Sequence, residues 1–156
     1  MGSIILAGVL LKIGGYGLFR FFLVYLNFDY FLDFFLLFGF LGGLCASVVC
    51  FSQVDLKCMV AYMSVSHMGL IFSSFFSGKV FGLFGFFFIM LAHGLSSSGL
   101  FSLIGFLYDR FHSRRMFLIK GGMKYFGPLP FWGFLLICGN ISCPPTINFF
   151  SELIIR

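Results

Sequence analysis

Long apolar runs separated by short polar stretches make up nearly the whole chain. The first run extends from Gly2 to Leu26, and a helix rising about 1.5 Å per residue would make it roughly 37 Å long, which exceeds a bilayer core of about 30 Å. A second run, from about Phe34 to Phe51, follows a polar loop that contains Asp29 and Asp33. Runs of this length predict transmembrane helices.

Two further runs follow at similar spacing. Asp55 precedes a third run that ends near Phe76, and we expect its carboxylate to cap that helix by accepting hydrogen bonds from free N–H groups. Residues 77–79 interrupt the pattern, and a fourth run extends from about Val80 to Tyr108. A charged loop from Asp109 to Lys124 separates the fourth run from the last.

A double proline marks the last predicted span. The run from Pro128 to Cys143 begins a helix that Pro144 and Pro145 must interrupt, because proline lacks an N–H donor and clashes with the preceding turn. The helix can resume at Asn148, and the sequence ends before this span would complete its crossing. We therefore predict an all-α bundle of about five transmembrane spans, the last one broken at Pro144-Pro145 and incomplete.

Composition supports a single membrane domain. Hydrophobic residues make up 60% of the 156 residues and charged residues 10%, whereas soluble domains carry roughly 25% charged residues. Because no extended polar stretch could form a second domain, we expect residues 1–156 to fold as one unit. Gly39 and Gly43 in the second run form a small-xxx-small pair, which predicts close approach of another helix.

The charges predict an orientation in the membrane. The positive-inside rule places the more basic side in the cytoplasm or the mitochondrial matrix. That side carries Asp55 and Asp109 with six cations, whereas the other carries only Lys79, Asp29 and Asp33. The six cations are Lys57, Arg110, Arg114, Arg115, Lys120 and Lys124. The basic run from Arg110 to Lys124 lies between two spans and lacks the aromatic interleaving suited to base stacking, so we expect no nucleic-acid partner.

Lys12 lies near the middle of the first predicted span. A lysine at mid-membrane costs roughly 2.5–3.5 kcal/mol, so it persists only where it faces other helices, water or an ion path. Snorkelling or pairing is the simpler alternative to a functional role. Arg20, nearer the end of the run, can reach an interface by extending its side chain.

Three more titratable residues lie at membrane depth: His67, His93 and Glu152. Histidine titrates near neutral pH and passes protons between its two ring nitrogens, while buried lysine and glutamate can also titrate there. Together with Lys12, these residues predict a proton relay. Two alternatives remain: each histidine could bond across helices to Ser64 or Ser97, or the two histidines could ligate a haem.

Other candidate sites carry less weight. The five cysteines lie in or beside apolar runs and form no C-x-x-C pair, so we expect small apolar residues there and no metal site. Asn140-Ile-Ser142 matches a glycosylation triplet but falls inside a predicted span, which argues against glycosylation.

Five stretches, in order, carry a family resemblance. They are LAGVLLKIGGYGLFR (6–20), DLKCMVAYMSVSHMGL (55–70), MLAHGLSSSGLF (90–101), YDRFHSRRM (108–116) and PPTINFFSELII (144–155). Together they resemble the mitochondrial NADH dehydrogenase subunit 4 family, antiporter-like proton-pumping subunits of respiratory complex I that are related to multisubunit sodium/proton antiporters. That family has about fourteen transmembrane helices in inverted repeats, and the resemblance aligns this chain with the eighth helix through the start of the twelfth.

The resemblance implies roles for the four titratable residues. Lys12 resembles the eighth-helix lysine that links the two half-channels, and His67 and His93 match histidines of the tenth and eleventh helices. Glu152 resembles the acid on the broken twelfth helix, where the second half-channel leads outward. The chain departs mildly from the family pattern: valine precedes Asp55, Asp109 replaces a glutamate, and Ser151 stands where glycine is usual.

The resemblance also implies what the chain lacks. The family's glutamate on the fifth helix and lysine on the seventh are absent, so we expect a second chain or further sequence to supply that half, and we expect this chain not to pump alone. No redox centre is expected here. NADH, flavin, iron–sulfur clusters and ubiquinone would be bound elsewhere in the complex.

The expected function is therefore that of a subunit of proton-translocating NADH:ubiquinone reductase, multi-pass in the mitochondrial inner membrane beside other membrane-arm subunits and the lipid bilayer. Two alternatives stay open. The chain could serve a multisubunit sodium/proton antiporter without NADH chemistry, or it could be a structural remnant in the membrane arm that moves no protons.

Overall fold

The computed structural model describes residues 2–24, 29–77, 79–121 and 126–155, with no account of the side chains of residues 29–31. Within these ranges the chain is helical except for turns and one isolated bridge, which confirms the all-α prediction. The elements are α1 (Gly2–Ile5), the π-helix η1 (Leu6–Leu10), α2 (Leu11–Val24), α3 (Asp29–Phe51), α4 (Leu56–Phe76), α5 (Val80–Phe111), α6 (Met116–Ile119), α7 (Leu129–Asn140) and α8 (Ile147–Ile155).

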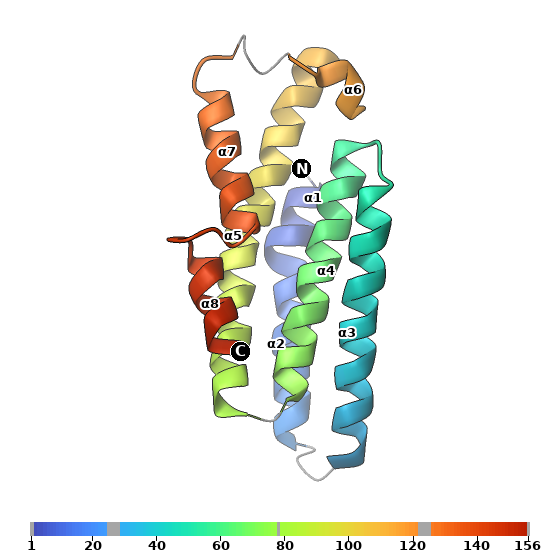
Figure 1. Ribbon diagram of the computed structural model, residues 1–156, viewed down its shortest axis with the longest axis vertical. Coiled ribbons are helices and arrows are strands. Elements are labelled where there is room, and N and C mark those ends of the chain that lie inside the picture. The colour runs from blue at the N-terminus through green and yellow to red at the C-terminus, as the bar shows by residue number, and fades with distance from the viewer. Residues whose placement is uncertain (1, 25–28, 78, 122–125, 156) are drawn as a thin grey trace.

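Four helical segments of the described chain are long and apolar enough to cross a membrane. They are Gly2–Val24, which combines α1, η1 and α2, then Leu32–Phe51, Leu56–Phe76 and Val80–Phe111. Figure 1 shows them side by side along the long axis of the molecule, with α7 and α8 following one another along α5. The multi-span bundle is confirmed, and the fifth span consists of a shorter apolar helix, α7, a break and α8.

Two predicted boundaries and one predicted helix cap are wrong. Asp33 lies inside α3, which begins at Asp29, and α5 continues past Tyr108 to Phe111. A helix can extend beyond the hydrocarbon layer, where charged side chains meet water, so charges alone do not end it. Asp55 precedes α4 in an extended conformation but makes no side-chain capping bond, and it forms an isolated bridge with Arg115.

α3 and α4 are held together by glycines. A methyl group built on Gly69 of α4 would lie 2.7 Å from the Gly43 Cα and 2.8 Å from the Gly39 carbonyl oxygen. Backbone therefore touches backbone, as the small-xxx-small pair predicts.

The basic residues gather at one end of the bundle. Leu56 donates its N–H to the Arg114 carbonyl and Met116 donates to the Val54 carbonyl, both at 3.1 Å. These bonds tie the α3–α4 connection to the segment after α5, whereas Lys79 lies at the α4–α5 connection at the opposite end (Figure 1). The charge asymmetry predicted from sequence is thus present in the fold, while Lys124 lies outside the described residues.

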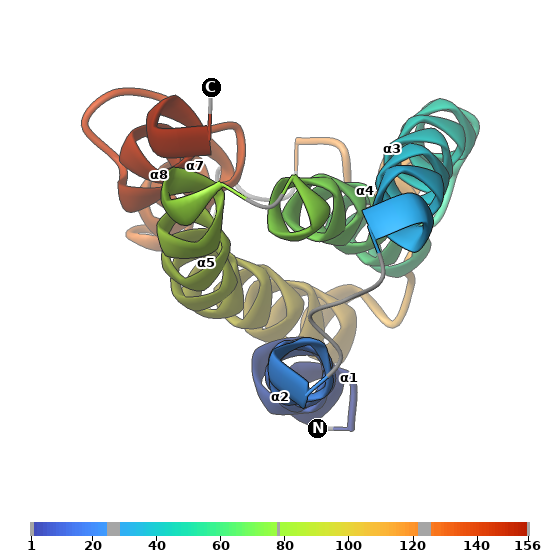
Figure 2. The same cartoon turned by 90° about the horizontal axis from the view of Figure 1, so that it is seen from below.

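α5 is the central helix. It contacts α1, η1 and α2 on one side, α4 on another and both α7 and α8 on a third. Figure 2 shows this arrangement from below, with α3 outermost beyond α4. Two buried apolar clusters line these contacts, one with Ala7, Leu100 and Phe101 and the other with Phe75 and Phe86. A polar residue at the middle of α5 is consequently enclosed by protein.

Candidate functional site

Lys12 faces α5. It lies one residue into α2, directly after η1, and its Nζ donates to the Ala7 carbonyl. A methyl group built on Gly94 of α5 would lie 3.1 Å from Lys12 Cε and 3.7 Å from Nζ. The missing side chain at Gly94 therefore makes room for the lysine stem. Lys12 is only half-buried, but its ammonium group is directed into the bundle next to His93.

His93 is enclosed at the middle of α5, with 1% of its surface exposed. Neither ring nitrogen has a hydrogen-bond partner of ordinary geometry among the described residues. The His67 ring on α4 lies against it, with ring centroids 5.1 Å apart and planes inclined by 36°. Lys12 packs against Gly94, the residue after His93, so titratable groups from three helices lie near one another here.

The predicted helix break lies between α7 and α8. α7 ends at Asn140, the chain turns through Ser142 with φ 61°, and the Cys143 N–H donates to the Cys138 carbonyl at 3.1 Å. This is the pattern by which a left-handed residue ends a helix. The helix ends earlier than Cys143, the predicted boundary, and resumes at Ile147.

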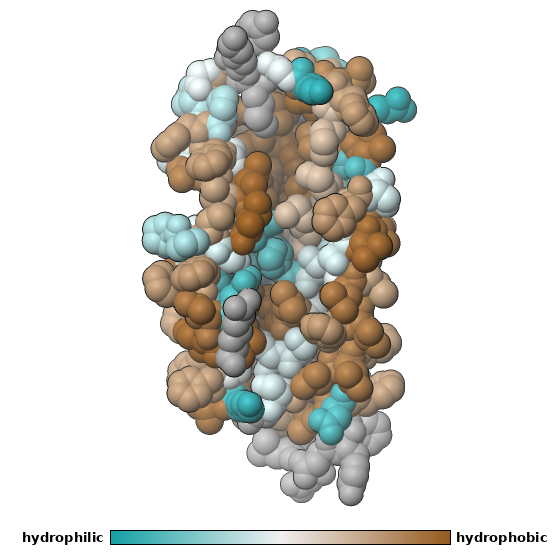
Figure 3. Space-filling view, in the orientation of Figure 1, coloured by the Kyte–Doolittle hydropathy of each residue, from teal (hydrophilic) through white to brown (hydrophobic). Residues whose placement is uncertain are grey.

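Glu152 is held at this break. Glu152 lies on α8, and its Oε1 accepts a hydrogen bond from Ser142 Oγ. A second bond joins α8 to the end of α7, because Asn148 Nδ2 donates to the Gly139 carbonyl at 2.6 Å. Glu152 also interacts electrostatically with His67. The two histidine rings are in contact, Lys12 lies beside Gly94, the neighbour of His93, and Glu152 lies at the helix break. We call these four residues, Lys12, His93, His67 and Glu152, the series. Figure 3 shows polar side chains at mid-height, in the recess between the C-terminal helices and α4 of an otherwise largely apolar face.

Comparison with known proteins places this arrangement in a family. The profile described as NADH:quinone oxidoreductase/Mrp antiporter, transmembrane, matches residues 1–155. The chain belongs to this family. It is a membrane protein, and the resemblance stated from its motifs is confirmed.

This family member is similar to several relatives over nearly its whole length. It is 43% identical to NADH-ubiquinone oxidoreductase chain 4 of Aedes aegypti, over 97% of this chain and 34% of the relative. It is 44% identical to chain 4 of Mytilus edulis, over 99% of this chain and 36% of the relative. It is 42% identical to chain 4 of Tropidolaemus wagleri, over 99% of this chain and 67% of the relative. The chain thus spans about a third of the length of the first two relatives.

Two residues of the site in this family member escaped the sequence prediction. Asn140 is 1% exposed and Ser96 8%. Ser96 Oγ lies 3.3 Å from the His93 carbonyl oxygen and 3.4 Å from Asn140 Oδ1. Asn140 drew notice only as part of a glycosylation triplet. A signal was present nevertheless, because an asparagine between an apolar run and a double proline is costly in a membrane unless it has partners.

The alternative partners for the histidines are not supported. Ser64 Oγ donates to the Ala61 carbonyl at 2.7 Å, within its own helix, and Ser97 Oγ has no partner among the described residues. The two tilted imidazoles are in contact, which leaves no room for a haem macrocycle between them. Among the described residues, no three His, Cys, Asp or Glu side chains are arranged to hold a metal ion.

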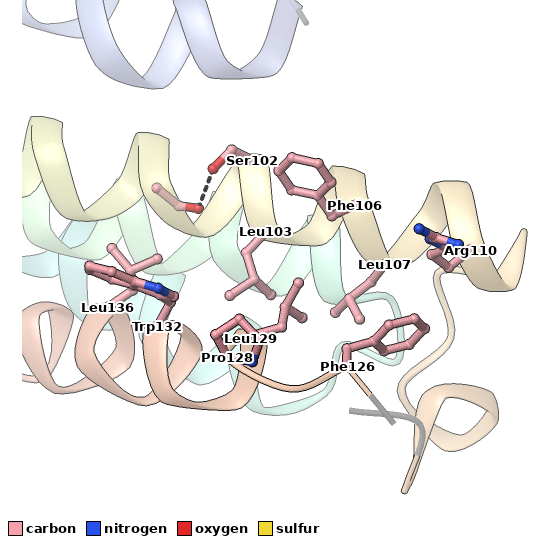
Figure 4. A pocket seen from close by; sticks show the side chains of 11 residues that line it. Ser102, Leu103, Phe106, Leu107, Arg110, Phe126, Pro128, Leu129, Trp132 and Leu136 are labelled. Atoms are coloured by element: carbon pink, nitrogen blue, oxygen red, sulfur yellow. Dashed lines mark hydrogen bonds between the residues drawn. The ribbon is translucent and has the colours of Figure 1, made fainter. Parts of the chain in front are cut away.

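An apolar groove of about 560 Å³ lies between α5 and α7, apart from the polar series. Figure 4 shows Leu103, Leu107 and Leu129 projecting into it, with Arg110 at one end. Arg110 lies 5.9 Å from the centre of the Phe126 ring. None of the four predicted site residues lines this groove.

Proposed function

We propose that this chain is a membrane-arm segment of NADH:ubiquinone oxidoreductase. In this role it contributes to proton translocation across the mitochondrial inner membrane, coupled to electron transfer from NADH to ubiquinone. The observation that carries the proposal is the series Lys12, His93, His67 and Glu152, which come from α2, α5, α4 and α8 of one bundle and of which His93 is fully enclosed. The names of the relatives support the same assignment.

Protons would move along this series by exchange between neighbours. Lys12 holds a proton at the edge of the series, and the two histidines pass protons between their ring nitrogens. Glu152, bonded to Ser142 at the helix break, receives them where the backbone is interrupted. Because charges interact strongly in a medium of low dielectric constant, a change of charge at one member alters the proton affinity of the next.

Electron transfer would occur elsewhere in the complex. The proposed role needs no cofactor on this chain, whereas NADH, flavin, iron–sulfur clusters and ubiquinone would be held by other subunits. The glutamate and lysine of the other half-channel would come from a second chain of the membrane arm or from further sequence of this subunit. The basic end, with Lys57 and Arg110, would face the matrix.

The test is the substitution Lys12→Met in the assembled complex. Methionine keeps the length and apolar stem of lysine but cannot carry a proton, so the number of protons moved per NADH oxidised should fall while assembly persists. Arg20→Met is the matched control, because Arg20 lies on the same helix, is exposed and, among the described residues, bonds to Tyr16 at 3.1 Å. An unchanged proton stoichiometry in Lys12→Met would contradict the proposal and favour a structural role.

Sodium/proton antiport is the second candidate, because the family description names Mrp antiporters. The two functions differ in their partners. Co-purification of the chain with flavin and iron–sulfur subunits would support the first, and sodium-driven proton flux from an assembly without redox centres would support the second.

A further inference from the structure

A second groove lies next to the apolar groove between α5 and α7. The first, which we call the α5–α7 groove, has a volume of about 560 Å³, and the second, the α5–α1 groove, about 400 Å³. Ser102 and Phe106 of α5 line both grooves, so the two grooves flank one strip of this helix. Phe106 is 65% exposed and belongs to the wall that they share. This face of α5 is therefore hollowed on both sides of a single row of side chains.

The walls of the α5–α7 groove favour an apolar occupant. Leu103, Leu107 and Trp132 line it (Figure 4). Ser102 Oγ donates to the Gly99 carbonyl at 2.7 Å, so this hydroxyl group is satisfied within α5. Burying a polar group against such walls without a hydrogen bond is unfavourable. An alkyl chain fits these walls better than a polar ligand does.

The length of the α5–α7 groove matches one leaflet of a membrane. It extends along α5 from Gly99 to Arg110, which at about 1.5 Å per residue is about 16 Å. Half of a bilayer core of about 30 Å is about 15 Å. A protein helix of this length, about 10 Å across, would occupy about 1,200 Å³, more than either groove holds. The dimensions of the groove are those of one acyl chain.

Basic side chains line both grooves at the same end of the bundle. Arg110 lies at one end of the α5–α7 groove (Figure 4). Lys57 and Arg114 line the α5–α1 groove together with Asp109. Three cations against one carboxylate leave this end of the two grooves positive. The charge complements an anionic group that lies above two apolar chains.

Aromatic rings hold the two arginines in place and leave their charge available. Arg110 lies 5.9 Å from the centre of the Phe126 ring, and Arg114 lies 4.8 Å from the centre of the Tyr108 ring. Neither guanidinium group is paired with a carboxylate among the described residues. A guanidinium group binds phosphate through two parallel hydrogen bonds. Both arginines can therefore receive a phosphate group.

We propose that this face of α5 binds one anionic phospholipid, with its two acyl chains in the α5–α7 and α5–α1 grooves and its phosphate beside Arg110 and Arg114. The grooves match the acyl chains in length and polarity, and the basic end matches the headgroup in charge. Each cation near the membrane surface strengthens the binding of an anionic lipid about 5-fold. The inference goes beyond proton translocation and holds whether or not the chain moves protons.

The test uses the assembled membrane complex, in which the protein neighbours of this face are in place. The complex is reconstituted in phosphatidylcholine vesicles that contain a small amount of photoreactive lipid, either phosphatidylglycerol or phosphatidylcholine, with the same diazirine-labelled acyl chain. After illumination, mass spectrometry identifies the labelled peptides. Phosphatidylglycerol should label residues 99–110 and 126–136 about 5-fold more than phosphatidylcholine, or better. Equal labelling would indicate bulk lipid, and no labelling would indicate a covering protein segment; both would overturn the proposal.

Arg110→Gln tests the headgroup contact. Glutamine carries no charge, so labelling by phosphatidylglycerol should fall about 5-fold while labelling by phosphatidylcholine stays the same. Arg110→Lys keeps the charge and should retain most of the preference. Arg20→Gln is the matched control, because Arg20 also lies over an aromatic ring, 5.6 Å from the centre of Tyr16, and is exposed near the far end of α2 (Figure 1). An unchanged preference in Arg110→Gln would overturn the proposal.

Gly105→Leu tests the second groove without changing a charge. Gly105 lines the α5–α1 groove, and a methyl group built on it has no neighbour within 4 Å, so a larger side chain enters the groove without displacing protein. Labelling by phosphatidylglycerol should fall several-fold, and undiminished labelling would overturn the proposal. Lys12→Met, the test of the proposed function, should leave labelling unchanged, because Lys12 lines neither groove. Failure of the proton path and failure of lipid binding are therefore distinguishable.

Discussion

The two sides of α4 pack in opposite ways. Toward α3, Gly69 meets Gly39 and Gly43 so closely that backbones touch. Toward α5, two residues earlier in the sequence, His67 meets the enclosed His93 ring. All three helices are apolar enough to cross a membrane. Polar groups are expensive at membrane depth, so the proposed function rests on the side that brings two histidines together.

The largest effect should come from closing the glycine contact. Gly69→Ala would place a methyl group 2.7 Å from the Gly43 Cα, and backbone cannot rotate away, so we expect a loss of stability of about 1–3 kcal/mol or more. Thermal denaturation of the assembled complex measures this loss. Gly42→Ala is the control, because a methyl group there has no neighbour within 4 Å. Equal stability of the two variants would refute the close contact.

A smaller and different effect is expected on the polar side. Gly94→Ala would bring a methyl group to 3.1 Å from Lys12 Cε, and the flexible lysine can shift by a few tenths of an ångström. Stability should therefore change little, whereas the proton-coupled rate should fall several-fold because Lys12 moves away from His93. Gly105→Ala, on the same helix and with open space around it, is the matched control. If Gly94→Ala lowered stability and left the proton-coupled rate unchanged, the contact between Lys12 and Gly94 would serve packing alone.

Much of this contrast could be predicted from the sequence. The lengths of the apolar runs indicate the spans, Gly39 and Gly43 indicate the close pair, and the double proline indicates the break. The end of α5 could not be placed, because a helix can continue into water and the charges of Asp109 and Arg110 do not stop it.

Contacts between helices could not be predicted from spacing either. Which turn of α5 faces Lys12 depends on Gly94, whose role emerges only when α2 packs against it. Asn140 could not be identified for the same reason: its partner Ser96 lies 44 residues away in the sequence and is brought to it by the fold. The cap expected from Asp55 is absent, and Asp55 forms a bridge with Arg115, a long-range pairing that no local pattern signals.

The central claim is that Lys12 and Glu152 belong to one proton path, and a pair of substitutions tests it most directly. Protons moved per NADH oxidised would be measured in assembled complexes carrying Lys12→Met, Glu152→Gln or both. Blocking a single path at either residue has the same consequence. Each single variant should therefore lose the same number of protons moved per NADH oxidised, and the double variant should lose no more than either. Losses that add in the double variant would contradict a single path through His93 and His67.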